Sequence, residues 1–283
     1  MKFCFGPNSY ESILVVTDDD RLIFESENTS FQRDDYTLPL IKSLGSSHEE
    51  TQLQKDKSSI GHFVMKGISS WRIYHFHDTS AEAKVKGLQP SNSNIRLQED
   101  AGNLAAYLAN LKHFYAPAYQ RIIETVHLVA PFFDTFFIRS PLPEYVKLEW
   151  LEKNGDPDTP YFANMLSDGT LRFICLATLL LQPIELLPDT ILIDEPELGL
   201  HPYAINILAD MIKQVAEKKQ VIVSTQSVEL LNNFSPEDII IAEREKEASI
   251  FKRLDDTQLA HWLEEYTLGE LWKSNVLGGR PRL

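Results

Sequence analysis

The sequence predicts an α/β fold in which helices cover both faces of a parallel sheet. Two stretches, residues 190–193 and 221–223, are apolar throughout, and a helical pattern over about residues 203–217 separates them. Strands that are apolar at every position and alternate with helices are typical of parallel sheets buried on both faces. A hydrophobic content of 43% over 283 residues is ordinary for a globular chain and sufficient for a sizeable core.

The N-terminal third predicts antiparallel strands. Residues 9–17 and 21–25 are rich in apolar side chains and flank an acidic turn, a pattern that indicates a hairpin. Residues 43–59 are polar without an apolar period, so we expect a loop or an exposed helix there. Residues 71–77 alternate well enough to form another strand.

The middle of the chain predicts helices and a returning strand. Apolar residues recur at helical spacing over residues 103–111 and again over 122–129. Residues 142–150 are expected to return as a strand. A helix over about residues 170–181 then leads into the first parallel strand, and a further helix is expected near residue 228.

Composition and charge narrow the range of functions. The net charge of −14 argues against a broadly basic nucleic-acid surface. Cys4 and Cys175 are far apart in the sequence, which excludes a disulfide framework and a Cys-x-x-Cys zinc site and indicates a reducing compartment. Because no apolar run reaches the roughly 18 residues that span a bilayer, we expect a cytoplasmic protein without a membrane partner.

Two carboxylates, Asp194 and Glu195, stand where the first parallel strand ends. Ligands of parallel α/β sheets bind at the carboxyl ends of the strands. Adjacent acids at such a place are costly unless a cation holds them, and a magnesium–nucleotide complex is the natural partner. The first acid would serve the metal shell and the second would polarise an attacking water. The plain alternative is a strand that ends in solvated acids.

Two polar turns accompany these acids. Ser167, Asp168 and Gly169 precede an apolar helix; either of the first two can cap it, and the glycine lets the backbone approach a ligand. Free N–H groups at a helix start bind phosphate. The second parallel strand ends in a polar cluster, residues 224–227, that can contact an outermost phosphate. The alternative for each turn is an ordinary helix cap.

Two histidines alternate on one face of the predicted strand over residues 71–77. His75 and His77 lie beside Asp78, and a His-x-His pair can bind a metal ion. No third ligand is spaced to complete such a site, although His62 could lie near it in the fold. We therefore favour a structural or interfacial role for the pair.

The order of these segments resembles the ABC-type ATPase head. More closely, it resembles the predicted AAA-family ATPases that group with the SMC, RecF and OLD-type proteins. The string Asp-Glu-Pro-Glu-Leu-Gly-Leu-His-Pro is quite specific, and the resemblance extends over nearly the whole chain. The segments that carry it are residues 71–79, 166–169, 191–202, 223–227, 268–272 and 278–281.

The resemblance implies a role for each of these site residues. Asp194 matches the Walker B carboxylate that serves Mg²⁺, and Glu195 matches the catalytic glutamate. Ser167, Asp168 and Gly169 match the signature motif, which contacts the γ-phosphate of a nucleotide held by the opposite subunit. The resemblance thus implies ATP and Mg²⁺ as ligands. It also implies a homodimer, or a complete ATPase partner, docked through the signature face, and a DNA-linked role by family analogy only.

The D-loop and the switch position complete the resemblance. Gln226 stands where the family usually has a switch histidine. A glutamine amide can donate a hydrogen bond to phosphate but cannot become cationic, so we expect weakened hydrolysis rather than lost binding. The D-loop, which lies at the dimer seam in the family, matches Glu197, Leu198, Gly199, Leu200 and His201.

One motif of the family is missing from these 283 residues. A Walker A loop reads Gly-x-x-x-x-Gly-Lys-Ser/Thr, and none of the 12 glycines is followed by lysine. We therefore expect an N-terminally incomplete P-loop NTPase fold, produced by truncation, by a split partner or by decay. Because the P-loop strand lies near the Walker B strand in this fold, its absence should expose an apolar edge and leave the chain alone poorly soluble or oligomeric.

We expect residues 1–283 to form a single ABC ATPase-like domain with three regions. Residues 1–100 would be the mainly antiparallel β region, 101–165 a helical lobe with its return strand, and 166–283 the signature, Walker B and switch region. The expected function is ATP hydrolysis, with nucleotide sandwiched between two subunits and little activity from this chain alone. The alternative is a non-catalytic interaction module that docks on a complete ATPase.

Overall fold

The computed structural model describes residues 1–33, 38–245, 248–254, 259, 262 and 265–277. Within it the chain divides into two compact units, Met1–Trp71 and Arg72–Leu283, each of which is described by itself. The expected single domain with three regions stays a prediction. The segment 278–281, part of the resemblance, lies outside the described residues. Within the described part, no helix has the length and apolar character needed to span a bilayer.

The first unit is a four-stranded antiparallel sheet with one helix packed on it. The strands follow the order β1 (Lys2–Phe5), β2 (Asn8–Val16), β3 (Leu22–Phe31) and β4 (Leu40–Gly45). The predicted hairpin is confirmed by the pairing of β2 with β3. Apolar side chains of α1 (Ser59–Ser69), including Ile60 and Val64, pack with Tyr10 and Leu53 in a small core.

The polar stretch over residues 43–59 differs in part from its prediction. Most of it is loop with a short 3₁₀ turn, η1 (Leu53–Lys55), but its first residues complete β4 and its last residue begins α1. The helix starts there because the Ser58 side chain accepts a hydrogen bond from the Gly61 N–H, satisfying one free donor of the first turn. Helix α1 was not predicted.

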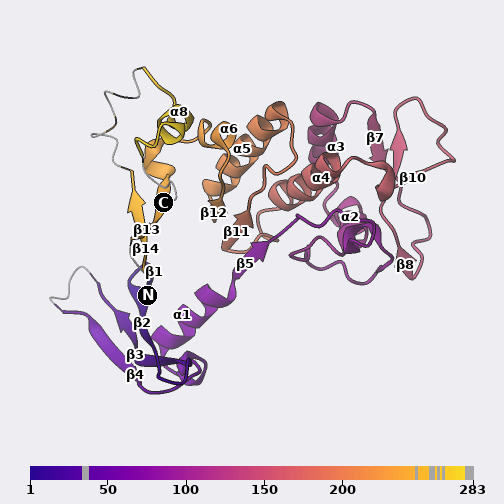
Figure 1. Ribbon diagram of the computed structural model, residues 1–283. Helices are drawn as coiled ribbons and strands as arrows, with labels where there is room; N and C mark the ends of the chain where they lie inside the picture. Colours follow the sequence, from indigo (N-terminus) through magenta and orange to yellow (C-terminus); the bar gives the residue numbers. More distant parts are fainter. Residues whose placement is uncertain (34–37, 246–247, 255–258, 260–261, 263–264, 278–283) are drawn as a thin grey trace. The chain divides into compact units, whose positions relative to one another are not determined.

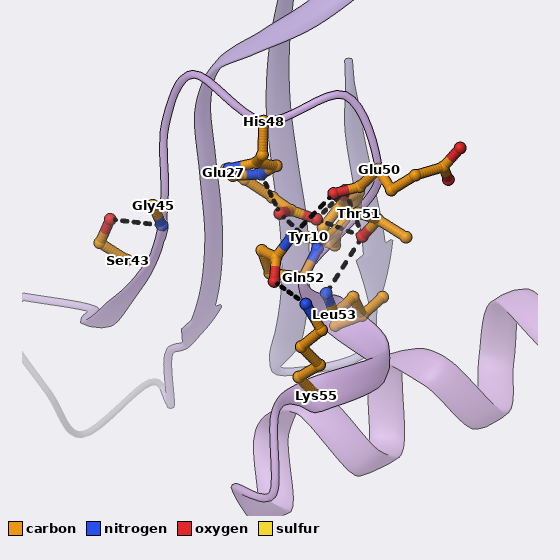
Figure 2. A network of polar contacts seen from close by, with 10 residues as sticks. All are labelled: Tyr10, Glu27, Ser43, Gly45, His48, Glu50, Thr51, Gln52, Leu53 and Lys55. Carbon is orange, nitrogen blue, oxygen red and sulfur yellow. Dashed lines mark hydrogen bonds and ion pairs between the residues drawn. The ribbon is translucent and has the colours of Figure 1, made fainter.

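A buried carboxylate joins this loop to the sheet. Glu27 on β3 has no exposed surface, and Figure 2 shows the polar side chains and the loop around it. It accepts hydrogen bonds from the Tyr10 hydroxyl at 2.6 Å, from His48 Nε2 at 2.8 Å, from the Gln52 N–H at 2.9 Å and from the Thr51 hydroxyl. Every donor comes from this unit, so the hydrogen-bonding needs of the buried Glu27 carboxylate are met within it.

The second unit contains the predicted parallel strands (Figure 1). β11 (Thr190–Asp194) runs parallel to β12 (Gln220–Ser224), and β5 (Trp71–Tyr74) is hydrogen-bonded to the other side of β11. Helix α5 (Pro202–Ala216) connects the two parallel strands, as the sequence predicted. The predicted strand–helix–strand unit is therefore confirmed.

The core of this unit is built around α4 (Asp168–Leu181), which packs against α3 (Ala116–Val129) and α5. Nearly every α4 side chain from Leu171 onward is buried, since this helix is apolar on all sides. Helix α2 (Leu104–Phe114) packs on α3, so the three helices predicted in this part of the chain are confirmed.

Smaller elements complete the second unit. The predicted return strand is interrupted: it forms two short strands that pair with different partners, in separate sheets ordered β6–β8 and β10–β9–β7. The hairpin of β13 and β14 was not predicted. The bounds are η2 (Lys84–Lys86), β6 (Gln89–Pro90), β7 (Phe133–Phe136), β8 (Tyr145–Val146), β9 (Glu149–Glu152), β10 (Tyr161–Phe162), η3 (Ala163–Met165), α6 (Val228–Leu231), η4 (Pro236–Asp238), β13 (Ile240–Glu245), β14 (Ala248–Arg253) and α8 (Leu268–Lys273).

Strand β12 lies at an edge of its sheet. Among the described residues it is hydrogen-bonded to β11 alone, and its central residue Ile222 is 47% exposed. An apolar strand edge of this kind can pair with another chain. This agrees with the exposed edge expected from the sequence, whereas the poor solubility or oligomerisation expected from it stays a prediction.

Candidate functional site

The C-terminal end of β11 carries the two predicted acids. Asp194 is the last residue of the strand, and its side chain is 44% exposed. Glu195 follows with φ of +37°, a left-handed conformation that is unusual for a residue with a side chain. Its N–H donates to the Ser224 carbonyl oxygen at 2.9 Å, which helps to hold this turn. Such backbone strain, of about 1 kcal/mol or more, is common at functional sites.

The last residue of β12 and the segment that follows it provide a hydrogen-bond donor to each nearby acid. The Ser224 hydroxyl donates to Asp194 Oδ1, because the register of the strands places these residues side by side. Gln226 Nε2 donates to Glu195 Oε1 at 3.1 Å. The structure thus brings the predicted switch residue next to the predicted catalytic glutamate.

Glu197 lies in the same cluster and is incompletely paired. The Thr225 hydroxyl donates to its Oε1 at 2.6 Å. Its other oxygen, Oε2, is buried and has no hydrogen-bond partner among the described residues. A buried carboxylate oxygen without a donor is costly, so this position is favourable for a donor or cation from outside the chain.

The two histidines after β5 both lie at Asp194. His77 Nε2 is 2.9 Å from the Asp194 carbonyl oxygen and must carry the proton, because a carbonyl can only accept. His75 Nδ1 is 3.8 Å from Asp194 Oδ2. His77 thus supports the backbone of the site. Nowhere in the described residues do three or more His, Cys, Asp or Glu side chains form a group able to hold a metal ion unaided.

The predicted signature turn caps α4. The Ser167 side chain accepts a hydrogen bond from the Thr170 N–H at 3.2 Å, as the capping interpretation predicted. Gly169 is in van der Waals contact with another turn, since a Cβ there would lie 2.4 Å from the Gly199 carbonyl oxygen. The glycine is therefore required by the packing of two turns. Asp168 lies 3.7 Å from Lys86 Nζ, a residue that the sequence analysis did not single out.

The predicted D-loop is a tight turn between β11 and α5. The N–H groups of Leu198 and Leu200 donate to the carbonyl oxygens of Glu195 at 3.2 Å and Glu197 at 3.0 Å. Gly199 has φ of +76°, which explains a glycine at this point. His201 caps α5 by accepting the Tyr203 N–H at 3.2 Å.

Arg172 is the other residue that the sequence analysis missed. It lies one turn into α4 and donates to carbonyl oxygens of Phe76 at 3.1 Å, His77 at 2.8 Å and Leu198 at 2.9 Å. The available signal was weak: Arg172 is the one charged residue within the apolar stretch 171–181. A charge in an apolar helix needs partners, but the sequence does not say which ones.

Comparison with known proteins identifies the family. The family described as "AAA domain, putative AbiEii toxin, Type IV TA system" matches residues 55–232, more than half of the chain. The chain belongs to this family. A "Putative ABC transporter ATP-binding protein" of Methanosarcina acetivorans is 29% identical to it over 131 residues, which are 41% of this chain and 44% of that protein. The matched part of this AAA-domain chain therefore spans less than half the length of that curated relative.

Solved structures show the fold. A crystal structure of an SMC head bound to the C-winged helix domain of ScpA superposes with a TM-score of 0.51 at 14% identity, covering 89% of this chain and 76% of that chain. A Pyrococcus furiosus Smc head bound to the C-terminal domain of ScpA covers 92% and 80%, with a TM-score of 0.47 at 14% identity. The first likeness and the family confirm the predicted α/β P-loop NTPase fold, ABC ATPase-like, of this AAA-domain chain.

Proposed function

We propose that this AAA-domain chain is an ABC-type ATPase head that binds Mg-ATP between two subunits and hydrolyses it. One observation carries the proposal: the ends of two parallel strands bring Asp194, Glu195 and Gln226 into one hydrogen-bonded cluster. Acids at the carboxyl end of a parallel strand are where α/β proteins bind ligands. Family membership supports nucleotide as that ligand.

The side chains at this cluster fit a magnesium ion. Asp194 offers carboxylate oxygen, the donor that Mg²⁺ prefers, on a side chain that is 44% exposed. The protein does not need to supply a full ligand set, because Mg²⁺ usually takes one or two carboxylates and completes its shell with water and substrate phosphates. The absence of a three-residue ligand group among the described residues is therefore compatible with this metal.

Each side chain then has a distinct task. Bound Mg-ATP supplies the γ-phosphoryl group and a cation that balances its charge. Glu195 orients the attacking water and takes its proton. Gln226 holds the Glu195 carboxylate and can donate to a phosphate oxygen, but it adds no positive charge. Asp194 would hold the metal ion, and Ser224 and His77 fix the position of this aspartate through its carboxylate and its carbonyl oxygen.

The cradle for the other phosphates is the part that these 283 residues do not contain. No glycine in the sequence is followed by the lysine of a P-loop. We propose that a P-loop from polypeptide outside this sequence completes the site. Ser167, Asp168 and Gly169 would contact nucleotide held by the opposite subunit, and the turn over residues 197–201 would lie at the seam.

The test is Mg²⁺-dependent phosphate release by the chain alone and by the chain coexpressed with a P-loop polypeptide. That polypeptide is the one encoded next to this chain or, failing that, a complete ATPase of the same family. We expect background turnover from the chain alone and clear turnover from the assembly. Robust hydrolysis by the chain alone would overturn the P-loop argument.

A non-catalytic module that docks on a complete ATPase is the second candidate. The contact of Gly169 with the Gly199 backbone favours it, because the two turns form a fixed surface that needs no P-loop of its own. Two variants separate the candidates. Ser167→Arg should abolish partner-dependent turnover under both, whereas Glu195→Gln should abolish it only if this chain hydrolyses ATP.

The compartment and partners are also proposals. Both cysteines are free, and burial raises the pKa of the Cys175 thiol to about 12, so that it stays protonated and unreactive. Two cysteines that form no disulfide with each other support a reducing cytoplasmic compartment. The partner is proposed to be a second copy or a complete ATPase; a DNA-linked role rests on analogy alone.

A further inference from the structure

Arg172 is held by backbone carbonyl oxygens rather than by an acid. Its Nε donates to Phe76, its Nη2 to His77 and its Nη1 to Leu198, and a longer contact of 3.5 Å reaches the Thr79 hydroxyl. None of the ion pairs among the described residues involves this guanidinium. Its role is therefore to connect three backbone segments that are far apart in the sequence.

The guanidinium group is suited to this task. Its N–H donors form a rigid planar fork, so three carbonyl groups in fixed directions can be bound at once. A lysine ammonium in the same place is a point charge on a flexible stem and cannot reproduce that geometry. Hydrogen bonds from a charged donor are also stronger than neutral ones.

Each of the three segments carries part of the proposed site. Helix α4, on which Arg172 lies, begins at the Ser167 turn. Leu198 belongs to the turn proposed for the subunit seam. The backbone carbonyl of His77 accepts a hydrogen bond from the Arg172 guanidinium. The ring N–H of the same histidine donates to the Asp194 carbonyl oxygen at 2.9 Å. One side chain thus links both partner-facing turns to the end of β11.

The two glycines of these turns belong to the same packing. A Cβ on Gly199 would lie 2.8 Å from Arg172 Nη1, and a Cβ on Gly169 would lie 2.4 Å from the Gly199 carbonyl oxygen. The two turns therefore approach one another, and the Gly199 turn approaches the guanidinium, more closely than side chains would permit. Their spacing is set by direct contact.

We propose that Arg172 is a positioning residue that fixes the spacing of the Ser167–Gly169 turn and the Leu198–Gly199 turn and ties both to Asp194. The partner-facing and metal-facing sides of the site then move as one unit. The meaning of these two sides rests on the proposed function, whereas the tie between the segments does not.

The first test reads the tie in the purified 283-residue chain. Arg172→Lys and Arg172→Met are compared with Arg139→Lys, a matched control whose guanidinium binds Glu149 at 2.9 and 2.6 Å on other segments. Hydrogen exchange is followed at the Leu198 and Leu200 amides, which donate hydrogen bonds within the turn.

We expect exchange at these two amides to rise at least tenfold in both Arg172 variants and to stay at the wild-type rate in the control. Unchanged exchange, or an equal rise at the amides of β7 and β9, overturns the proposal, since the latter would show general destabilisation.

The second test uses the assembly that hydrolyses ATP. We expect Arg172→Lys to lower kcat at least tenfold and to change the KM for ATP less than threefold, because the cradle for nucleotide is elsewhere. An unchanged kcat overturns the positioning role. Failure of the proposed function would be seen separately, as turnover that is insensitive to Glu195→Gln, and the exchange experiment would still decide whether the tie exists.

Discussion

Glu27 on β3 and Glu195 at the end of β11 are both glutamates among polar side chains, but they differ in how completely the chain surrounds them. Glu27 is fully buried and receives hydrogen bonds from Tyr10, His48, Thr51 and the Gln52 amide. Glu195 is partly exposed, has a strained backbone and receives one hydrogen bond from the side chain of Gln226.

The comparison separates an acid that stabilises a fold from one suited to chemistry. A carboxylate whose oxygens are all satisfied has no capacity left for a ligand. Glu195 and its neighbour Glu197, whose Oε2 is buried without a partner among the described residues, keep that capacity. The same substitution, glutamate to glutamine, should therefore act on activity at one place and on stability at the other.

The largest effect is expected for Glu195→Gln. Turnover of the ATP-hydrolysing assembly should fall at least about 100-fold, because an amide cannot take a proton from water. The melting temperature of the chain should stay within about 2 °C of wild type, since the backbone turn and the contact with Gln226 can remain. Phosphate release measures the turnover, and thermal unfolding measures the melting temperature. A large loss of stability would show that this acid is structural and would break the comparison.

The next effect is expected for Glu27→Gln, which should cost about 2 kcal/mol of unfolding free energy in residues 1–71. The oxygen of a glutamine amide can still accept some of these hydrogen bonds, but they are weaker because the acceptor is no longer charged. The NH₂ group of the amide would face groups that are themselves hydrogen-bond donors. Native-state hydrogen exchange of β2 and β3 amides measures this unit separately. Glu11→Gln, an exposed acid on β2, is the control and should change nothing.

The lowered pKa of Glu27 should make the stability of this unit depend on pH. Burial by itself would raise the pKa of Glu27, but the bonds from Thr51, Tyr10, the Gln52 amide and His48 outweigh it and hold the pKa below its ordinary value of 4.5. Because the folded value is the lower one, the stabilisation is complete above about pH 4.5 and is lost as the pH falls through the folded value. Glu27→Gln should flatten this acid dependence.

A smaller effect is expected for Gln226→His. An imidazolium beside Glu195 could balance charge that develops on the phosphate, so turnover of the assembly should rise roughly tenfold. ATP affinity should change little. Equal turnover in the two proteins would show that the missing cation does not limit hydrolysis. Gln226→Asn is the control, because its shorter amide adds no charge.

The smallest effect is expected for Glu197→Gln. The amide oxygen can still accept a hydrogen bond from Thr225, although this bond is weaker without the charge. Removing the negative charge from a buried oxygen that has no partner among the described residues offsets that weakening. The free energy of unfolding should change by less than about 0.5 kcal/mol. Urea unfolding of this variant beside Glu27→Gln sharpens the comparison; a loss as large as that of Glu27→Gln would place Glu197 with the structural acids.

The sequence was sufficient to predict that Asp194, Glu195 and Gln226 lie close together, but not which residues surround Glu27. Asp194, Glu195 and Gln226 follow two apolar strands, and the carboxyl ends of parallel strands meet at one edge, so their proximity follows from the pattern. Glu27 is completed by a loop whose polar residues have no period, so no pattern indicated His48 or Thr51 as its partners.

Arg172 shows a second limit. Its partners are backbone carbonyl groups, which every residue has, on segments nearly 100 positions before it and 26 after it. Side-chain identity therefore says nothing about them. The returning strand over residues 142–150 was placed correctly but proved to be two short strands, because pairing with two different sheets depends on tertiary contacts.

The pairing register of β11 and β12 has a consequence for which changes the site could survive. Asp194 stands beside Ser224, and Ile193 beside Val223. Inserting one residue within β12 would bring Val223 to Asp194 and move each polar donor of residues 224–226 past its acid. An insertion in the surface turn between α5 and β12 would leave this alignment intact. The site is thus encoded as an alignment between two strands, and a shift of one residue erases it without altering the identity of a single site residue.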